Sequence, residues 1–433
     1  MTPDYDYIIL GAGPGGYELA AMLNAKELKV ALVEPDNVGG TCLNRGCIPT
    51  KTLCHAAELA SQAAEGARYG IDCSVNTIDW SKLMERKNEV VGTLRQGIET
   101  SLKGVDIIRS RGRLEGPGEV ATDDGTVITG KKIVIATGAK PAMPPIEGAH
   151  HCITSNELLS LDTRPESIVI IGGGVIGLEF ASILAALGSD VTVVEAMKEI
   201  LPQFDRAIAK RLRSMLSQRG IKFHVDSKVT SISADGEVTF ESKGKPKSVT
   251  AQKVLMAVGR VPQFPDGLEK AGIEFNRRGI TVNPETFETN VSGIYAIGDV
   301  NGLCQLAHAA TAQARCVAGL ECELGVIPSA VFTLPEAGMV GLTEEKCAEL
   351  GLPVKVTSTM YGTNGKAMSM GAERGMVKMI SDPESGKIVG CHVVGAHAAD
   401  LVNAAAIAMA NNLTMANLEA TILAHPTLTE LLH

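Results

Sequence analysis

The strongest constraint on the fold is a pattern that occurs twice in this chain of 433 residues. An apolar run, predicted as a buried strand, leads into a G-x-G-x-x-G turn and a helical stretch, and a second apolar strand then ends in an acid. Glycine is required because the chain bends tightly there and its backbone must approach a pyrophosphate group. The first copy contains Gly11, Gly13, Gly16 and Glu34, and the second contains Gly172, Gly174, Gly177 and Glu195.

The two copies also share their spacing. Glu34 stands 23 residues after Gly11, and Glu195 stands 23 residues after Gly172. Agreement in both register and spacing argues against the alternative that each copy is a glycine-rich turn serving only packing. The sequence therefore predicts an α/β protein with two Rossmann-like dinucleotide-binding domains, in which each acid accepts hydrogen bonds from ribose hydroxyls.

The surroundings of Glu195 indicate which nicotinamide dinucleotide the second copy prefers. A carboxylate at this position favours a free ribose 2′-hydroxyl and repels a 2′-phosphate, which usually needs a nearby arginine. The next residues are Ala196, Met197 and Lys198, so no arginine follows directly. We therefore expect NAD rather than NADP.

Composition and charge argue against other classes of protein. The net charge of -9, without a basic run that contains aromatic residues, is unlike a nucleic-acid-binding protein. Residues 168–188 are apolar, but they contain Glu179 and five glycines, so a buried strand, turn and helix explains them better than a membrane span. Since Met1 to Asp6 is polar and does not resemble a signal peptide, we expect a cytoplasmic protein.

Residues 39–51, GGTCLNRGCIPTK, place Cys42 and Cys47 behind a double glycine. Two cysteines this close can close and reopen a small disulfide ring, which passes two electrons each time. On the pair alone, two buried core thiols remain an alternative, and so does a metal site. The metal interpretation is the weakest, because Thr50 stands where an iron–sulfur loop needs a further cysteine.

The other cysteines show no pairing pattern, and we interpret them as buried or bystander thiols: Cys54, Cys73, Cys152, Cys304, Cys316, Cys322, Cys347 and Cys391. Two further segments, 133–138 (IVIATG) and 293–299 (GIYAIGD), are predicted strands that end at a glycine turn. From the residue alone, Asp299 either caps the next helix or binds a ligand hydroxyl, and capping is slightly favoured.

Together these motifs resemble one family. GGTCLNRGCIPTK after a first fingerprint, ATG at 136–138, a second fingerprint, GD at 298–299 and HPTLTE at 425–430 follow one another in that order. In the order of these motifs, across its whole length, the chain resembles the pyridine nucleotide–disulfide oxidoreductases that carry a flavin. Within that family it looks most like the branch that oxidises dihydrolipoamide and reduces NAD.

The resemblance implies a division into domains. Residues 1–145 would form the first part of an FAD-binding domain, and residues 263–327 would complete it. Residues 146–262 between them would bind NAD. Residues 328–433 would form an α+β interface domain that joins two copies into a homodimer.

The resemblance also implies the cofactor contacts. FAD would contact the first fingerprint, Glu34, and residues spread along the chain: Gly40, Thr41, Lys51, Thr137, Gly138, Asp299, Leu306, Ala307 and His308. NAD would contact the second fingerprint, Glu179, Glu195 and Gly259. No metal site is implied.

A histidine near the carboxyl end would complete the chemistry. Oxidation of a dithiol needs a base for a thiol proton, and neutral imidazole suits this because its reference pKa of about 6.5 lies near operating pH. His425 is the candidate, and Glu430 could accept its other N–H. The pair alone would more simply be a helix cap or a surface pair. The resemblance makes it catalytic, acting on the disulfide of the other subunit, with Cys42 attacked by substrate and Cys47 against the flavin.

The same resemblance gives Lys51 an ion pair beside the flavin, and it makes His425-Pro426 a candidate cis bond. Two departures from the family stand out. The chain stops at His433, three residues after Glu430, so we expect looser dimer packing. Arg45 stands between the two cysteines, and we expect its charge to lower a thiolate pKa.

Three rival functions fit the motifs less well. Relatives that reduce glutathione prefer NADP and carry arginines after the second fingerprint, unlike this chain. Relatives that reduce mercuric ion end in a cysteine pair, which is absent. A non-catalytic docking subunit would not need the cysteines or the His425–Glu430 pair, yet all four residues are present.

Overall fold

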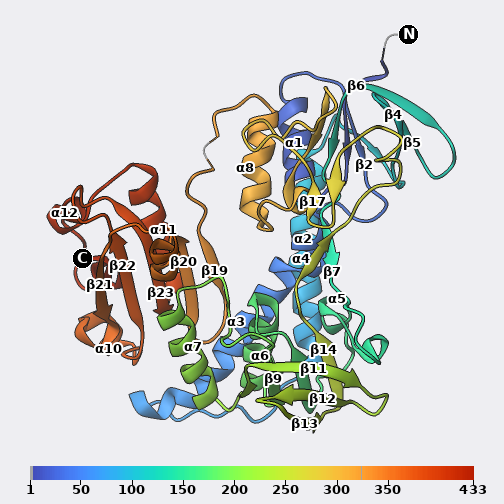
Figure 1. Cartoon of the computed structure of the whole chain (residues 1–433). Helices are drawn as coiled ribbons and strands as arrows, with labels where there is room; N and C mark the ends of the chain where they lie inside the picture. Colours follow the sequence, from blue (N-terminus) through green and yellow to red (C-terminus); the bar gives the residue numbers. More distant parts are fainter. Residues whose placement is uncertain (1–2, 323) are drawn as a thin grey trace. The chain divides into compact units, whose positions relative to one another are not determined.

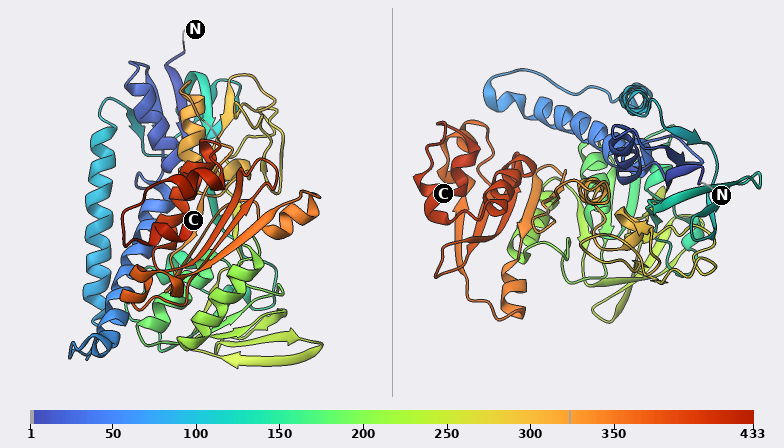
Figure 2. Two further views of the ribbon diagram at one scale, coloured as in Figure 1. Left: turned by 90° about the vertical axis from the view of Figure 1, so that its left-hand side faces the viewer. Right: turned by 90° about the horizontal axis from the view of Figure 1, so that it is seen from above.

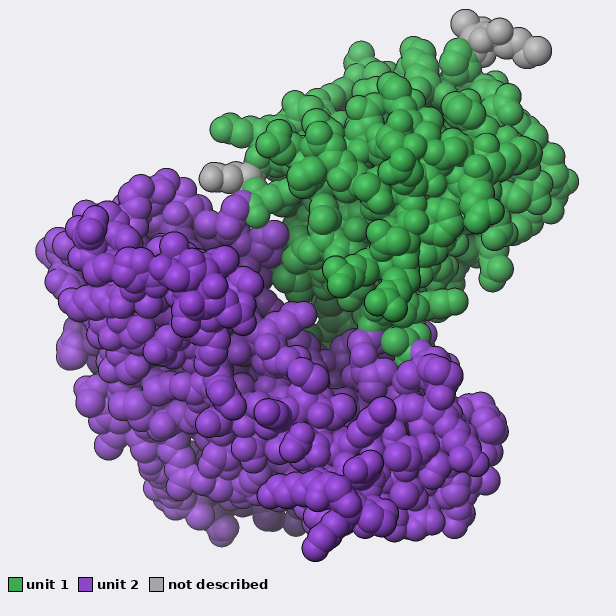
Figure 3. Space-filling model, viewed as in Figure 1, with its two compact units in different colours: residues 1–52, 82–142, 260–324 green, residues 53–81, 143–259, 325–433 purple. Residues whose placement is uncertain are grey.

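A computed structural model of the chain describes residues 3–322 and 324–433. Its elements form two compact units, which Figure 3 distinguishes by colour. Unit 1 contains residues 1–52, 82–142 and 260–324, and unit 2 contains residues 53–81, 143–259 and 325–433. Helix α3, Cys47–Glu65, begins in unit 1 and continues into unit 2.

Unit 1 is built on a seven-stranded sheet in the order β3-β2-β1-β6-β5-β4, with β18 also paired to β6. Strands β1, β2, β3, β6 and β18 run parallel, whereas β4 and β5 extend the sheet antiparallel. The parallel strands are rich in Ile, Val and Leu because both faces of the sheet are covered. The strands are β1 Tyr5–Leu10, β2 Val30–Val33, β3 Asp106–Ile108, β4 Arg113–Gly116, β5 Glu119–Ala121, β6 Val127–Ile135 and β18 Ile294–Ala296.

Helices α1 and α8 cover one face of this sheet and pack on each other through apolar side chains such as Leu19 and Val317 (Figure 1). The helices that lie mainly in unit 1 are α1 Pro14–Asn24, α2 Gly40–Arg45, α4 Trp80–Ser101 and α8 Ala307–Val317, with a short 3-10 turn η3 at Gly298–Asn301. Two small antiparallel pairs complete the unit: β7 Ala139–Pro141 with β15 Arg260–Pro262, and β16 Phe275–Asn276 with β17 Gly279–Ile280.

Unit 2 contains a second parallel sheet, in the order β10-β9-β8-β14, next to a three-stranded antiparallel sheet β11-β12-β13. Helix α6 follows β8 directly, as α1 follows β1. These elements are α5 Ser155–Leu158, β8 Ser167–Ile171, α6 Val175–Ala186, β9 Asp190–Val194, α7 Arg206–Gln218, β10 Lys222–His224, β11 Ser227–Ile232, β12 Glu237–Ser242, β13 Lys245–Thr250 and β14 Lys253–Met256, with 3-10 turns η1 Gly66–Tyr69 and η2 Ala149–His151.

The carboxyl-terminal part of unit 2 is a five-stranded antiparallel sheet, in the order β19-β20-β23-β22-β21, on which helix α11 packs (Figures 1 and 2). The last turn of the chain, η5 Leu428–Leu432, buries three leucines in the same core. The elements are β19 Ser329–Val331, β20 Glu336–Gly341, α9 Glu344–Glu349, β21 Lys355–Met360, η4 Tyr361–Thr363, α10 Gly365–Ser369, β22 Met376–Ser381, β23 Ile388–Gly395, α11 Ala398–Ala410 and α12 Met415–Ala420.

The predicted fold class is confirmed, with two dinucleotide-binding sheets and a carboxyl-terminal α+β sheet. Unit 2 combines the second dinucleotide-binding sheet with the carboxyl-terminal sheet, and the domain boundaries expected after residues 145, 262 and 327 stay predictions. Within the described residues, no helix has the length and apolar character needed to cross a membrane.

Candidate active site

The first fingerprint is a tight turn with one open side. Gly11 has a φ of +101°, and a Cβ atom there would lie 2.5 Å from the carbonyl oxygen of Ala136. A Cβ atom on Gly16 would lie 1.9 Å from the carbonyl oxygen of Gly11. A Cβ atom on Gly13 would meet nothing within 4 Å. Two of the glycines are therefore needed for packing, while Gly13 leaves room for a ligand at the amino terminus of α1.

The second fingerprint repeats this geometry at α6. Gly172 has a φ of +110°, and a Cβ atom there would lie 2.4 Å from the carbonyl oxygen of Ala257. A Cβ atom on Gly177 would lie 2.1 Å from the carbonyl oxygen of Gly172, whereas one on Gly174 would meet nothing within 4 Å. The open position is again the middle glycine, so this loop also has room for a pyrophosphate.

The acid of each copy is fixed by the loop that it faces. Glu34 accepts hydrogen bonds from the backbone N–H of Ala12, at 2.8 Å, and from that of Asp36, at 2.9 Å. Glu195 accepts from the N–H of Gly173, at 2.5 Å, and from that of Met197, at 2.6 Å. Each carboxylate oxygen has a further lone pair, so both acids can still accept from a ribose hydroxyl.

Cys42 and Cys47 come together within unit 1. Cys42 lies on α2 and Cys47 is the first residue of α3; both are half-buried thiols in this structure. The hydrogen bond with Cys47, with burial, raises the pKa of the Cys42 thiol well above its usual value, and the charge of Lys51 opposes this. A helix amino terminus stabilises a thiolate, so Cys47 is the better placed of the two to carry the charge.

Close contacts hold the segment that contains Cys42 and Cys47 against the first fingerprint. Gly40 has a φ of +57°, and a Cβ atom there would lie 2.5 Å from the Cα atom of Gly13. The side-chain amide of Asn44 donates to the carbonyl oxygens of Val38 and Gly40, both at 3.0 Å. Arg95 on α4 donates to the Asn44 side-chain oxygen at 2.7 and 3.1 Å. No sequence pattern indicates Arg95, because its contact depends on how α4 returns to α2.

Arg45 lies beside an acid, and the expectation that its charge lowers a thiolate pKa stays a prediction. Its guanidinium forms an ion pair with the carboxylate of Asp36, and both side chains are exposed. For Cys42, whose pKa is raised overall, the positive charge that opposes the rise is that of Lys51. The ion pair with Asp36 partly compensates the charge of Arg45, which still contributes to lowering the pKa of Arg260.

Arg260 is a residue of the site that the sequence motifs did not indicate. Its Nε atom lies 3.9 Å from the carboxylate of Asp299, and its guanidinium contacts the hydroxyl of Thr41, at 3.4 Å, and the carbonyl oxygen of Ala139. Burial lowers the pKa of Arg260 and the charge of the nearby Arg45 adds to this, whereas the negative charge of Asp299 opposes it. The signal that could have found it is its place after Gly259, where the chain turns as it does at Gly138.

Asp299 lies in η3 and does not cap the helix that comes next in the chain. Helix α8 has Leu306 as its N-cap, and no side-chain hydrogen bond caps it. The capping interpretation of Asp299 is therefore wrong. Burial raises the pKa of Asp299, and Arg260 lowers it in part. This leaves a half-buried carboxyl group that faces the same arginine as Thr41.

The other predicted FAD contacts lie at turns of unit 1. The Thr137 hydroxyl donates to the carbonyl oxygen of Gln263 at 2.5 Å, which holds the ATG turn against the segment after β15. Gly138 has a φ of +71°, with open space at its Cβ position. The predicted NAD contact Gly259, which belongs to unit 2, has a φ of +111° and the same open space. Leu306, Ala307 and His308 occupy the N-cap and first turn of α8.

The predicted NAD contact Glu179 lies on α6 and is 4% exposed. Its carboxylate accepts a hydrogen bond from the backbone N–H of Phe332 at 3.0 Å. One turn later the hydroxyl of Ser182 accepts from the N–H of Leu334 at 2.9 Å. Glu179 therefore has a structural role within unit 2, because it ties α6 to the segment that leads into β20.

His425 and Glu430 are brought together as expected. The Nδ1 atom of His425 lies 3.0 Å from a carboxylate oxygen of Glu430. The His425 side chain is 80% exposed, whereas that of Glu430 is 23% exposed. The buried leucines of η5 on either side of Glu430 fix its position, and the carboxylate in turn orients the exposed ring of His425. The peptide bond between His425 and Pro426 is cis, as predicted.

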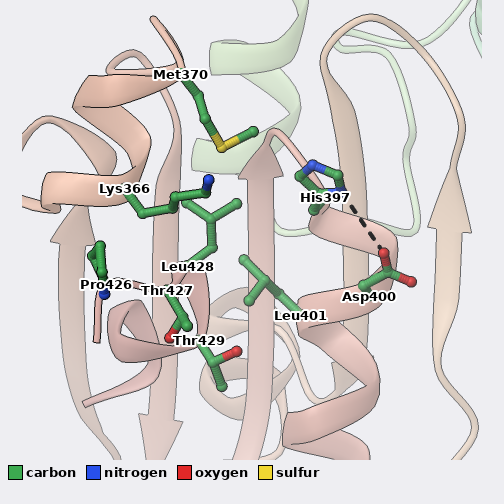
Figure 4. A pocket seen from close by; sticks show the side chains of 9 residues that line it. All are labelled: Lys366, Met370, His397, Asp400, Leu401, Pro426, Thr427, Leu428 and Thr429. Atoms are coloured by element: carbon green, nitrogen blue, oxygen red, sulfur yellow. Dashed lines mark ion pairs between the residues drawn. The ribbon is translucent and has the colours of Figure 1, made fainter. Parts of the chain in front are cut away.

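The residues between His425 and Glu430, 426–429, contribute to the lining of a pocket of about 360 Å³ (Figure 4). Apolar side chains of Met370, Leu401 and Leu428 line it together with the charged side chains of Lys366 and Asp400. The remaining lining residues are His397, Pro426, Thr427 and Thr429. The carboxylate of Asp400 lies 3.8 Å from Nδ1 of His397. Together with the ammonium group of Lys366, this carboxylate gives the lining of the pocket both signs of charge.

One prediction about the remaining cysteines is wrong. Cys316 and Cys322 form a disulfide, with their Cα atoms 5.5 Å apart. The other six are thiols in this structure, of which Cys54, Cys347 and Cys391 are buried. The CVAGLEC spacing allows the bond because the chain turns back immediately after α8.

Comparison with known proteins decides the family. Residues 5–314 match the family described as pyridine nucleotide-disulphide oxidoreductase, and residues 327–433 match its dimerisation domain. The chain belongs to this family. Similar curated proteins include the dihydrolipoyl dehydrogenase of Chlamydia muridarum, 37% identical over 99% of this chain and 96% of that protein. That of Bacillus subtilis is 36% identical over 99% of this chain and 97% of its own length.

Solved structures agree with this assignment. The HOCl-induced flavoprotein disulfide reductase RclA from Escherichia coli superposes with a TM-score of 0.88, at 31% identity, over 99% of this chain and 98% of that chain. Its Cu(II) complex gives a TM-score of 0.87, at 30% identity, over 98% of both chains. This chain is thus an NAD-dependent flavoprotein disulfide oxidoreductase, with FAD and NAD as its cofactors. The open middle glycines and the fixed acids of both loops fit two dinucleotides.

Proposed function

We propose that this protein oxidises the dihydrolipoyl groups of lipoyl-bearing proteins to the cyclic disulfide and reduces NAD to NADH. The observation that carries the proposal is the pair of half-buried thiols, Cys42 and Cys47, fastened to the first fingerprint at the start of a helix. Relatives that cover nearly the whole chain are dihydrolipoyl dehydrogenases, which supports this substrate. Lipoyl domains of 2-oxo acid dehydrogenase or glycine cleavage complexes would present it.

Four side chains would share the chemistry: those of Cys42, Cys47, His425 and Glu430. The neutral ring of His425 takes a proton from the substrate dithiol through Nε2, while Glu430 holds Nδ1–H and stabilises the imidazolium. The substrate thiolate attacks Sγ of Cys42 in the Cys42–Cys47 disulfide and releases Cys47 as a thiolate. The second substrate thiol then displaces Cys42, so two electrons and two protons leave the substrate as its ring closes.

The cofactor contacts would be made by the two fingerprints. The first fingerprint, Glu34 and Asp299 would hold FAD, which would supply a two-electron acceptor between the dithiol and NAD. Arg260 would fix the orientation of Thr41 and Asp299 beside it. The second fingerprint and Glu195 would hold NAD, and the carboxylate of Glu195 would select against a 2′-phosphate.

The active unit would be a homodimer. Residues 327–433 match a dimerisation domain, and the side chain of His425 is exposed on it. In this arrangement His425 of one copy serves the cysteine pair of the other. A cytoplasmic location, where lipoyl-bearing complexes would be met, stays a prediction from the sequence.

Anaerobic titration of the purified holoenzyme with dihydrolipoamide tests the proposal. We expect a long-wavelength charge-transfer band as the Cys47 thiolate forms beside the oxidised flavin, followed by NADH when NAD is added. A flavin that stays oxidised with dihydrolipoamide but is reduced by NADH would contradict the proposed substrate.

Substitutions of the acid–base pair test its role. His425→Gln should slow NADH formation by about 10²- to 10⁴-fold, and Glu430→Gln should slow it by a smaller factor.

A second candidate is a reductase that runs from NADH to another acceptor. The observation in its favour is the close superposition on RclA, which is described as a flavoprotein disulfide reductase and has been solved with Cu(II). Among the described residues, no cluster of three or more His, Cys, Asp or Glu side chains could hold a metal ion. The same titration separates the candidates, since only the first predicts reduction by dihydrolipoamide.

A further inference from the structure

The disulfide between Cys316 and Cys322 lies where the chain leaves unit 1. Cys316 belongs to the last turn of α8, and unit 1 ends two residues after Cys322, at residue 324. The dimerisation-domain match begins at residue 327. The bond therefore closes a small ring on the connection between the first dinucleotide-binding fold and the dimerisation domain.

Hydrogen bonds tie this stretch to the rest of unit 1 only as far as Glu321 among the described residues: the backbone N–H groups of Gly319 and Leu320 donate to the carbonyl oxygens of Cys316 and Arg315, both at 2.9 Å. The ammonium group of Lys26 donates to the carbonyl oxygen of Ala318 at 2.5 Å, and the guanidinium of Arg315 donates to that of Glu321 at 3.3 Å. Leu324 packs against the apolar core of unit 1. For the described residues beyond Glu321, the disulfide and this packing are what the structure shows holding the chain to α8.

The ring is open to solvent on one side. Gly319, Leu320 and Glu321 are exposed, and the two cysteines themselves are half-buried rather than enclosed in the core. A thiolate must reach one sulfur along the S–S axis for exchange, so disulfides at a surface exchange far more readily than those in a core.

We propose that Cys316–Cys322 is a second, exchangeable disulfide, which clamps the connection to unit 1 and which small dithiols open. A thiolate of the dithiol attacks one cysteine sulfur, the S–S bond breaks, and a mixed disulfide forms. The second thiol of the reagent then displaces the cysteine and closes the reagent into a ring. Two electrons and two protons pass to the chain, which gains two thiols. This clamp does not rest on the proposed function, because it needs only a dithiol.

Peptide mapping of the holoenzyme tests the exchange. Trypsin cuts after Arg315 and after Lys346, so Cys316 and Cys322 share one peptide that contains no other cysteine. Cys42 and Cys47 fall on separate peptides because Arg45 lies between them. The folded protein is incubated with and without dithiothreitol, alkylated with iodoacetamide and then digested. We expect peptide 316–346 to carry no label before reduction and two labels after it. Two labels without dithiothreitol, or none with it, would overturn the proposal.

Limited proteolysis tests the clamp. A glutamate-specific protease cuts after exposed Glu321 only where the chain can leave α8. We expect several-fold faster cutting there after reduction, and equally fast cutting of Cys316→Ser/Cys322→Ser without reduction. Cys73→Ser, which changes an exposed cysteine elsewhere, should behave as the unmodified protein does. Equal rates for the oxidised, reduced and doubly substituted proteins would show that the disulfide clamps nothing.

Discussion

The two dinucleotide-binding copies share the backbone contacts of their loops and differ in the segment after the acid. In the first copy the N–H of Gly39 donates to the carbonyl oxygen of Ala12 at 2.8 Å. In the second copy the N–H of Leu201 donates to the carbonyl oxygen of Gly173 at 3.0 Å. Ala12 and Gly173 are each the second residue of a fingerprint, so both copies bring the chain back to the same point of the loop.

After that point the copies diverge. In the first, the chain continues into α2 and α3, which hold Cys42 and Cys47. In the second, it continues to Asp205, the fully buried N-cap of α7, which pairs with Lys378 of β22 at 2.7 Å. The fingerprint therefore determines where a dinucleotide fits. The segment after the acid decides whether the copy carries redox chemistry or supports the carboxyl-terminal sheet.

The largest difference between the two copies is expected when the dithiol of the first copy is removed. Cys47→Ser removes one sulfur of the pair, and we expect NADH formation from dihydrolipoamide to fall by at least about 10³-fold. Steady-state absorbance at the NADH band measures this. Oxidation of NADH by a dye acceptor is the control, because the second copy is untouched and should keep that activity. Retention of a tenth of the dihydrolipoamide activity would contradict the division of roles.

The anchor of the second copy is tested by Asp205→Asn. The variant leaves the buried ammonium of Lys378 with Glu344 as its remaining ion partner, and we expect a loss of roughly 3 kcal/mol in unfolding free energy. Urea denaturation at pH 7 measures it. Cys47→Ser is the matched control in the first copy and should change the unfolding free energy far less.

The same ion pair sets a pH dependence. Burial raises the pKa of Asp205, but Lys378 and the other neighbouring groups outweigh this and leave the pKa below its ordinary value. A carboxyl group with a lowered folded pKa contributes stability above its unfolded pKa of about 3.9, and the contribution is lost as the pH falls through the folded value. The difference between the natural protein and Asp205→Asn should therefore shrink below about pH 4. A constant difference would contradict this assignment.

The middle glycines offer a matched pair of variants with intermediate effects. Gly13 and Gly174 have φ values of -71° and -80°, which alanine adopts, and an added Cβ atom meets no protein atom within 4 Å. The methyl group would instead crowd the ligand, so we expect about a tenfold loss of binding in each case. Gly174→Ala should raise the KM for NAD while the FAD content stays unchanged. Gly13→Ala should lower FAD retention, and equal effects of both variants on NAD would contradict the assignment of the copies.

The smallest expected effect is that of Glu195→Gln. The amide keeps the shape of the side chain but loses the charge and one acceptor for the loop N–H groups. We expect the KM for NAD to rise about fivefold and the preference over NADP to fall by a similar factor. Steady-state kinetics with both nucleotides measure this. Glu34→Gln is the control in the first copy, and a matching change in nucleotide preference there would contradict the comparison.

Much of the candidate site could be predicted because its residues lie close together in the sequence. The spacing of Gly11, Gly13 and Gly16 is a requirement of one turn, and the pair Cys42 and Cys47 lies within one loop and helix start. His425 and Glu430 are also brought together locally, by η5. Such contacts depend on a few backbone angles, so a pattern of residue types is enough to indicate them.

The sequence by itself determined the two fingerprints, their acids, the dithiol and the fold class, because each follows from local geometry repeated at fixed spacing. Only the tertiary structure decided that Arg260 faces Asp299, that Asp36 pairs with Arg45, and that Asp205 pairs with Lys378 across 173 residues of chain. Even Cys316 and Cys322, six residues apart, are joined because of the direction in which the chain turns after α8. A contact between side chains depends on where the backbone brings them, and residue types alone do not specify that path.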